Sequence, residues 1–303
     1  TAGESFHTTI LACDDNWNWV QTVDHTINVI TSDTNDVEPG NINMQNGIAI
    51  ATITFRTRTS AATITAQDAQ VGINPELADF TSSEIQVVSN SPAKLQILLP
   101  GEHTEEGSLP YGRSGTPLYQ TAGESFPVTV NICDDYWNLT TASATVQLTT
   151  SDPNDDGIYD PYQQTVINGT TVFNVTLFTA STFTLRVTDI DGQEPSLVEF
   201  TSSISTIVAN TPEKILVVLE GESFAPGTPS GKSGTPDEQT AGKSFNVYVW
   251  LTDNWWNRTD YNGNYVEIYS PVDDYDIEPD SKPFVNGSIV FTMNLIVAST
   301  SHY

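Results

Sequence analysis

The chain has 303 residues, and its 38 acidic residues outnumber 10 basic ones to give a formal net charge of −28. This excess of negative charge repels nucleic acids and anionic lipid surfaces, so we expect no nucleic-acid partner. Hydrophobic residues make up 38% of the chain and aromatic residues 10%, which is enough apolar material for folded domains with sizeable cores. The sequence has no run of about 18 apolar residues, so we expect no membrane insertion in this segment.

A hexapeptide occurs three times along the chain. TAGESF at residues 1–6 recurs at residues 121–126, and TAGKSF stands at residues 240–245. A step of about 120 residues is too long for one solenoid repeat and matches one whole domain. A second landmark keeps this step, because SPAKLQILLPGE at 91–102 corresponds to TPEKILVVLEGE at 211–222. The predicted units are residues 1–91, 92–211 and 212–303.

Both ends of the chain fall inside a predicted unit. If the strand near Pro92 opens unit 2, then unit 1 lacks its opening strand and unit 3 stops at Tyr303 before its last strands. We therefore expect only unit 2 to be complete and the chain to be a window on a longer repeat protein. The mass of the native polypeptide would test this expectation.

The residues of each unit follow the patterns of β-strands. Apolar residues alternate with other residues from Phe126 to Ile132, which is the period of a half-buried strand. Thr- and Val-rich runs follow at 183–189 and 205–210. An Asn-Gly pair, which favours a type I′ hairpin turn, occurs in each unit, at Asn46-Gly47, Asn168-Gly169 and Asn286-Gly287. About seven short strands per unit predict an all-β chain of tandem immunoglobulin-like antiparallel β-sandwich domains in a linear array.

These motifs resemble a known family of repeats. The pattern TAGxxFxVTVxxxDxxxN, the strand ending in TSDPND at 150–155, the Asn-Gly hairpin and TASTFTLRVTD at 179–189 are similar to bacterial immunoglobulin-like (Big-type) tandem repeats of large secreted and cell-surface proteins. The resemblance covers all three units and implies the fold, while such repeats serve as stalks, spacers and filament-forming or adhesive modules. Family members often have Gly where this chain has Trp17, Trp137 and Trp256, so we expect a bulkier, packed turn there.

An acidic loop follows the first alternating strand of each unit, in CDDNWN, CDDYWN and TDNWWN, and a second acidic loop follows the next strand. Loops at one end of a sandwich can converge, and carboxylate and amide oxygens are the ligands that Ca²⁺ selects. The alternative is that Asp and Asn only make turns by bonding their own backbone. The candidate calcium ligands are Asp14, Asn18, Asp36, Asp134, Asn138, Asp155, Asp253, Asn257 and Asp274.

The tryptophans of these loops have two interpretations. Exposed indoles could stack on sugar rings, whereas a Trp in this part of an immunoglobulin-like sandwich more often fills the core. Because Trp17, Trp137 and Trp256 recur in register, we interpret them as core anchors. The aromatic residues that vary between units are better candidates for contacts with neighbouring chains or ligands, and these are Trp19, Tyr136, Trp250 and Trp255.

The two cysteines stand at equivalent positions of adjacent units. Cys13 and Cys133 should therefore lie about a domain length apart, far beyond the roughly 4.4–6.8 Å between Cα atoms that a disulfide requires. We expect no intramolecular disulfide. The main interpretation is a small, partly buried strand residue, and an intermolecular bond between chains is the alternative.

The sequence holds no catalytic motif such as GxSxG, HExxH or CxxC, and its conspicuous residues are triplicated, whereas a catalytic centre is normally unique. We therefore predict that the chain is not an enzyme. Five N-x-S/T sequons are candidates for glycosylation, at Asn138, Asn168, Asn174, Asn257 and Asn286.

Two functions follow as hypotheses. The first is an extracellular structural repeat protein at the cell surface, which forms a stalk, layer or filament with neighbouring copies through junctions and strand edges, and which calcium could stiffen. The second is an adhesin or carbohydrate-binding module whose loop aromatics contact glycans. A glycan array and the native assembly state would discriminate between them.

Overall fold

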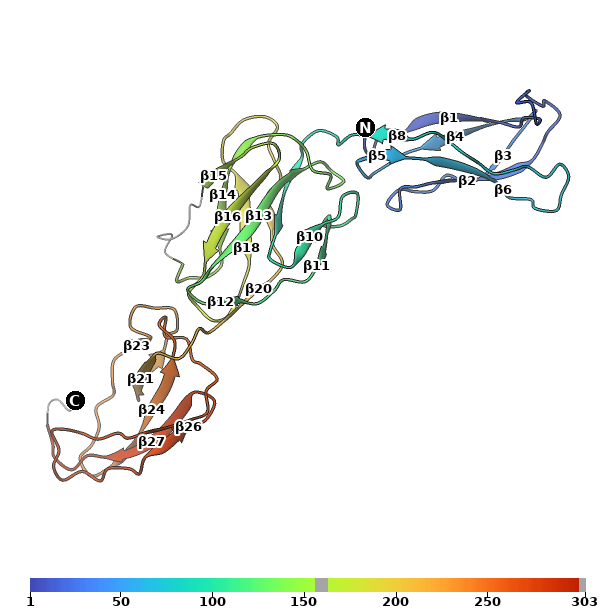
Figure 1. Cartoon of the computed structure of the whole chain (residues 1–303). Helices are drawn as coiled ribbons and strands as arrows, with labels where there is room; N and C mark the ends of the chain where they lie inside the picture. Colours follow the sequence, from blue (N-terminus) through green and yellow to red (C-terminus); the bar gives the residue numbers. More distant parts are fainter. Residues whose placement is uncertain (156–162, 300–303) are drawn as a thin grey trace.

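The computed structural model describes residues 1–155 and 163–299. These residues form β-strands, turns and loops and contain no α-helix, so no helix in them could cross a membrane. Three lobes lie in a row, with unit 1 at one end, unit 2 in the middle and unit 3 at the other end (Figure 1). Each lobe has its own cluster of buried hydrophobic residues.

Unit 1 contains eight strands in three small sheets. The strands are β1 (Phe6–Leu11), β2 (Thr26–Thr31), β3 (Gly40–Asn43), β4 (Ile48–Ile53), β5 (Thr59–Ala62), β6 (Ile64–Asp68), β7 (Phe80–Thr81) and β8 (Ile85–Val87). The sheet orders are β1-β4, β3-β2-β6-β7 and β5-β8.

The described part of unit 2, without residues 156–162, contains twelve strands. They are β9 (Lys94–Leu98), β10 (Glu102–Thr104), β11 (Arg113–Gly115), β12 (Gln120–Thr121), β13 (Ser125–Cys133), β14 (Ala144–Thr150), β15 (Gln163–Val166), β16 (Thr170–Thr176), β17 (Thr182–Phe183), β18 (Leu185–Asp189), β19 (Phe200–Thr201) and β20 (Ser205–Val208). The sheet orders are β16-β13-β9, β15-β14-β18-β19, β12-β20-β17 and β10-β11.

Unit 3 contains seven strands. They are β21 (Lys214–Leu219), β22 (Glu222–Phe224), β23 (Lys232–Gly234), β24 (Ser244–Thr252), β25 (Gly263–Val266), β26 (Lys282–Phe284) and β27 (Ser288–Asn294). The sheet orders are β21-β24-β27, β22-β23 and β25-β26.

The core of unit 2 lies between two sheets. One face of β13 buries Val128, Val130 and Ile132, as the alternating pattern predicts. These side chains belong to the same hydrophobic cluster as Leu148 of β14 and Val187 of β18, which come from the other large sheet. The arrangement is consistent with a β-sandwich, and the prediction of an all-β chain is confirmed.

The Asn-Gly pairs make the predicted hairpin turns. Asn46, Asn168 and Asn286 each have a positive φ of 53°, 54° and 48°, and the glycine after each is positive as well. Two successive positive φ angles are the requirement of a type I′ turn, which Asn and Gly meet at low cost. The turns position return strands β4, β16 and β27 beside β1, β13 and β24.

Candidate functional site at the junctions between units

Each CDDNWN-type loop is closed by its own aspartate. In unit 2, one carboxylate oxygen of Asp134 accepts hydrogen bonds from the backbone N–H groups of Tyr136 and Asn138, both at 2.9 Å. The amide nitrogen of Asn138 donates to the other oxygen at 2.9 Å. Asp253 and Asn257 repeat this geometry in unit 3. Asp and Asn therefore bond the backbone of their own turns in these loops, and this geometry does not decide between the two interpretations.

The tryptophan before each of these asparagines has a left-handed backbone. The φ angles of Trp17, Trp137 and Trp256 are 63°, 67° and 65°. Such angles are uncommon for bulky residues and normal for glycine. The hydrogen bonds around the aspartate hold the strained residue in place.

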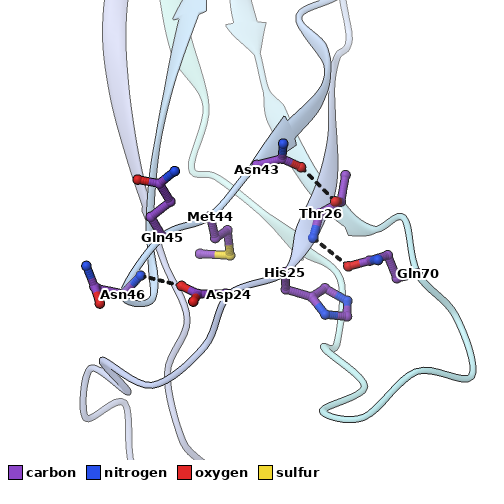
Figure 2. Close-up of a pocket in the computed structure, with 8 residues that line it drawn as sticks. All are labelled: Asp24, His25, Thr26, Asn43, Met44, Gln45, Asn46 and Gln70. Atoms are coloured by element: carbon purple, nitrogen blue, oxygen red, sulfur yellow. Dashed lines mark hydrogen bonds between the residues drawn. The ribbon is translucent and has the colours of Figure 1, made fainter.

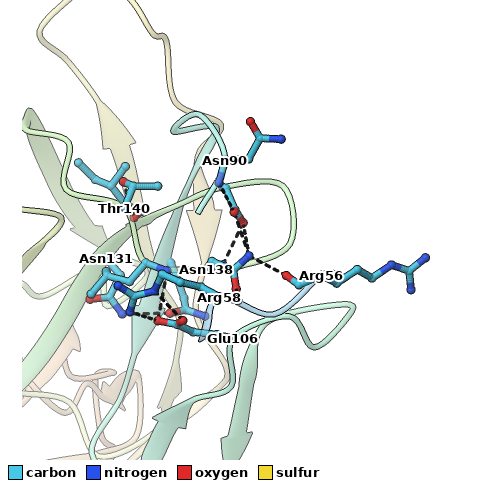
Figure 3. A network of polar contacts seen from close by, with 11 residues as sticks. Arg56, Arg58, Asn90, Glu106, Asn131, Asn138 and Thr140 are labelled. Atoms are coloured by element: carbon cyan, nitrogen blue, oxygen red, sulfur yellow. Dashed lines mark hydrogen bonds and ion pairs between the residues drawn. The ribbon is translucent and has the colours of Figure 1, made fainter. Parts of the chain in front are cut away.

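The Asp134–Asn138 pair also binds unit 1 (Figure 3). The side-chain oxygen of Asn138 accepts the backbone N–H of Arg58 at 2.8 Å, and its amide nitrogen donates to the backbone oxygen of Arg56 at 2.8 Å. The second oxygen of Asp134 accepts the backbone N–H of Asn90 at 2.8 Å. We call this arrangement the Asp–Asn clamp.

The second junction has the same clamp. Asn257 accepts the backbone N–H of Ala180 at 2.7 Å and donates to the backbone oxygen of Phe178 at 2.8 Å. Asp253 accepts the backbone N–H of Asn210 at 2.9 Å. Two junctions about 120 residues apart in sequence are thus made by the same atoms.

In units 1 and 2, the second acidic loop supports the segment that the clamp of the next unit holds. One carboxylate oxygen of Asp33 accepts the backbone N–H groups of Arg56 and Thr57, at 2.6 Å and 2.8 Å. Burial pushes the pKa of Asp33 upward, but hydrogen bonds from Thr57 and its neighbours outweigh it and leave the pKa below its usual value. Asp152 makes the equivalent bonds to Phe178 and Thr179. Both segments therefore present their backbone to the next unit in a fixed shape.

The two acidic loops of one unit do not converge, which corrects the expectation from the sequence. In unit 2 the first loop contacts unit 1 through Asn138, while the second contacts unit 3, where Asn154 donates to the backbone oxygen of Pro226 at 3.2 Å. The loops that meet belong to neighbouring units, because the first and second acidic loops of unit 2 lie at opposite ends of its lobe.

The predicted calcium ligands are accordingly distributed over several places. Asp14 and Asn18 bond each other on the exposed end of unit 1, and the Asn18 amide lowers the pKa of Asp14. Asp36 accepts from Thr31 in the second loop, Asp155 holds the same position in unit 2, and Asp274 is exposed in unit 3. Among the described residues, no group of three or more His, Cys, Asp or Glu side chains is arranged around a common metal position. Calcium binding stays a prediction.

Aromatic side chains and glycines pack across both junctions. A Cβ atom on Gly3 would lie 2.1 Å from the ring of Tyr136, and one on Gly123 would lie 1.9 Å from Trp255. The ring centroids of Trp255 and Phe178 are 4.3 Å apart. Tyr136 and Trp255 were predicted to contact neighbouring chains or ligands, and they contact the preceding unit of the same chain.

Two other variable aromatics make contacts inside their own unit. Trp19 donates its indole N–H to the backbone oxygen of Gly47 at 3.1 Å. Trp250 stacks on Phe224 with ring centroids 4.5 Å apart.

The predicted core anchors have different surroundings. Trp137 is 5% exposed and belongs to the unit 2 core, as expected. Trp256 is half-buried and donates to the backbone oxygen of Pro229 at 3.1 Å. Trp17 is 71% exposed, so the anchor prediction is wrong for unit 1. The reason is that segments at Gly112 and Gly231 cover the other two indoles, whereas among the described residues no equivalent segment covers Trp17.

The candidate glycosylation sites fall into two groups. Asn138 and Asn257 are fully buried and use their amides in the clamps, so the folded chain does not offer them to an enzyme. The exposed sequon asparagines are Asn168, Asn174 and Asn286.

Cys13 and Cys133 do not bond each other, in line with the expected absence of an intramolecular bond, and burial raises the pKa of Cys133 to about 12.

The sequence patterns also contained residues of the junction that we did not single out. Asn90 and Asn210 follow the last strand of their units, and each donates its side-chain amide to the backbone of Ala2 or Ala122. Their positions keep the step of the repeat, so an alignment of the units within the chain was the available signal.

An open depression of about 480 Å³ lies in unit 1 (Figure 2). Thr26 donates its hydroxyl to Asn43 at 2.8 Å and its N–H to Gln70 at 2.8 Å. The buried His25 contacts Asp68 at 2.6 Å, and hydrogen bonds from the Leu77 N–H and then from His25 lower the pKa of Asp68 to about 2. These groups pair with one another and tie loops together, so we assign the depression a structural role.

Comparisons with family models and with curated proteins found no match to this chain. Among solved structures, trypsin-activated alpha-2-macroglobulin from Escherichia coli aligns with 97% of the chain at 12% identity and a TM-score of 0.28. The chain spans 21% of that protein's length. A similarity of this degree carries no argument, and the resemblance to bacterial immunoglobulin-like repeats stays a prediction.

Proposed function

We propose that the chain is a non-enzymatic structural repeat protein of the cell exterior. It would consist of tandem immunoglobulin-like sandwiches held in line as part of a surface stalk, layer or filament. The observation that carries the proposal is the Asp–Asn clamp, because the same side-chain and backbone atoms join unit 1 to unit 2 and unit 2 to unit 3.

The clamp binds backbone atoms and not side chains. Asn138 binds the backbone of Arg56 and Arg58, and Asn257 binds that of Phe178 and Ala180, although these side chains have nothing in common. The clamp itself therefore requires this backbone shape and no particular side chain at these positions. A joint of this kind suits a serial array better than a single specialised complex.

The junctions also have a direction and several points of attachment. Arg58 and Glu106 form a bidentate ion pair across the first junction, at 2.6 Å and 2.9 Å. The Asn35 side-chain amide of unit 1 donates to the backbone oxygen of Glu106 at 3.2 Å, and Tyr136 packs on Gly3 of unit 1. Several contacts at one junction restrict rotation between lobes, which is the property that a stalk or filament requires.

Electron microscopy of material taken from the source organism tests the proposal. We expect rods, filaments or a layer with a repeat along their length. Small-angle scattering of the 303-residue chain should give an extended particle, and a double variant Asn138→Ala, Asn257→Ala should bend more freely. A native protein that is a compact monomer with catalytic turnover would contradict the proposal.

The alternative function is glycan recognition, and one feature of unit 3 favours it. An open depression of about 530 Å³ is lined by Tyr269, Asp273 and Glu278 among others, and the nearby Tyr275 is highly exposed. Exposed aromatic rings with polar neighbours suit the stacking and hydrogen bonding of sugars. A glycan array tests this function, with Tyr269→Ala as the control, and an array without hits would leave the structural role.

A further inference from the structure

The two junctions share the Asp–Asn clamp but differ in the side chains around it. The clamp binds only backbone atoms, so it does not distinguish one preceding unit from another. Any preference for a particular neighbour has to come from side chains that meet across the junction. The backbone segment held by each clamp brings two such side chains, from Arg56 and Arg58 in unit 1 and from Phe178 and Ala180 in unit 2.

The residue that faces this segment is held at the same place in both junctions. Asn35 of unit 1 donates its side-chain amide to the backbone oxygen of Glu106 at 3.2 Å, and Asn154 of unit 2 donates in the same way to Pro226 at 3.2 Å. The glycine after Glu106 and the glycine after Pro226 each pack against a threonine of the preceding unit. Glu106 and Pro226 therefore occupy equivalent positions, and their side chains can be compared directly.

The first junction is charged (Figure 3). Arg58 donates from Nη2 and Nε to the two carboxylate oxygens of Glu106, at 2.6 Å and 2.9 Å. The two side chains are 41% and 20% exposed, so water screens the pair only in part. A bidentate pair of this kind fixes orientation in addition to its attraction. The Arg56 guanidinium lies 5.7 Å from the centre of the Tyr136 ring, which adds a cation–π contact across the same junction.

The second junction has apolar contacts at these positions. Phe178 is 5% exposed and packs on Trp255 with ring centroids 4.3 Å apart, while Ala180 and Pro226 stand where the first junction has its arginine and glutamate. Unit 2 thus presents Glu106 toward unit 1 and apolar side chains toward unit 3. Its two ends do not match each other, because a second copy of unit 2 joined behind the first would set Glu106 opposite Ala180 with no cation.

We propose that residues 58 and 106 are the specificity determinants of the first junction. The face of unit 2 that carries Glu106 selects a preceding unit with an arginine at the position of Arg58 and disfavours one with a small apolar residue there. Without the arginine, the Glu106 carboxylate keeps only the Leu139 N–H, at 3.4 Å, as a donor among the described residues. This largely buried carboxylate would then lack a counter-charge in a chain of net charge −28. The proposal rests on the contacts of the two junctions and does not depend on the proposed function.

Hydrogen exchange in the 303-residue chain measures each junction separately. The backbone N–H of Asn90 donates to Asp134 at the first junction, and that of Asn210 donates to Asp253 at the second. Both amides lie outside the residues to be changed, so their exchange reports the opening of a junction and not the chemistry of a substitution. The amides of β14 control for the folding of unit 2.

An exchange of charges tests complementarity at the first junction. Arg58→Glu sets two carboxylates against each other, and we expect it to speed exchange of the Asn90 amide about fivefold or more without changing that of Asn210. Adding Glu106→Arg restores an ion pair of the opposite sense and should return the rate to within about twofold of the original. Residues that only fill space would show no such rescue. A double variant that exchanges as fast as Arg58→Glu alone would overturn the proposal.

The second junction provides the converse test. Ala180→Arg places a cation opposite Pro226 and should speed exchange of the Asn210 amide, and adding Pro226→Glu should slow it again because the pair of the first junction is recreated. Sodium chloride at about 1 M, where screening acts over about 3 Å, should speed exchange of the Asn90 amide about twofold and leave Asn210 unchanged. Equal responses to salt at the two junctions, or no recovery from the added glutamate, would contradict the proposal.

Discussion

At the scale of single residues, one amide side chain decides how neighbouring units join. Asn138 offers an oxygen and an NH₂ group on one short side chain, and it satisfies the N–H of Arg58 and the C=O of Arg56 together. Asp134 is buried beside it, and its carboxylate accepts hydrogen bonds from N–H groups of Asn90, Tyr136 and Asn138. Asn18 occupies the same position in unit 1, where it is exposed and, among the described residues, bonds Asp14 of its own loop.

This difference predicts unequal effects of the same substitution. Asn138→Ala removes two hydrogen bonds between units and one to buried Asp134, so we expect it to lower the free energy of unfolding by about 1–3 kcal/mol. Asn18→Ala removes only exposed bonds inside its loop and should lower the free energy by less than about 1 kcal/mol. Chemical denaturation of the 303-residue chain measures both. Equal losses would show that the bonds between units contribute nothing.

The pair of His25 and Asp68 predicts a dependence on pH. The folded pKa of Asp68 is about 2, below its ordinary value of 3.8, so the paired carboxylate stabilises the fold above about pH 4 and loses this contribution as the pH falls toward 2. We expect Asp68→Asn to lower the melting temperature at pH 6 and to have little effect near pH 2. A difference in melting temperature that stays constant from pH 6 to pH 2 would contradict this assignment.

At the scale of elements, the same loop has a different environment in each unit. The turn with a left-handed tryptophan is built by local hydrogen bonds and occurs three times. Whether its indole is buried depends on the strand and hairpin beside it, since Trp137 is covered and Trp17 is not. At each junction a glycine of one unit packs against an aromatic ring of the next unit. Gly242 is the equivalent glycine of unit 3, and a Cβ atom on it would have no neighbour within 4 Å.

Gly123 and Gly242 therefore form a matched pair for mutation. Both have a positive φ, of 78° and 77°, so an alanine at either position should cost about 1–2 kcal/mol. At Gly123 the new Cβ would also collide with Trp255, whereas nothing lies within 4 Å at Gly242. We expect Gly123→Ala to destabilise the chain by about 1–3 kcal/mol more. Urea denaturation compares the two variants, and identical midpoints would argue against a tight packing of Trp255 on unit 2.

At the scale of the whole molecule, a net charge of −28 is distributed over three lobes. The second acidic loop of unit 1 carries part of this charge. Burial raises the pKa of Asp36, and burial followed by the charges of Asp36 and Asp33 raises that of Glu38. A bound cation would stabilise carboxylates that repel each other in this way. Calcium therefore remains our proposal for the stiffening of the array.

Calcium should accordingly raise the melting temperature in proportion to the logarithm of its concentration above its dissociation constant, because it binds the folded state. Excess chelator should reverse the rise, and Asp36→Asn should reduce the part that comes from unit 1. Magnesium at equal ionic strength is the control for simple screening. A melting curve that is unchanged by calcium and by chelator would remove calcium from the proposal.

Local patterns in the sequence determined the strands, the hairpin turns and the threefold repetition. Alternation from Phe126 to Ile132 and the Asn-Gly pairs depend on neighbours a few residues away, so they could be predicted. The distance that keeps Cys13 and Cys133 from bonding each other could be expected from the length of the repeat.

Only the tertiary structure decided what the aspartates and tryptophans do. Asn138 meets Arg58 across 80 positions of the sequence, and no local pattern states which end of a lobe a loop occupies. Trp17 and Trp137 share a backbone conformation and a motif but differ in burial, because burial depends on strands far away in the chain or absent from beside β1. Backbone shape is a local property, whereas contact and burial belong to the assembled units.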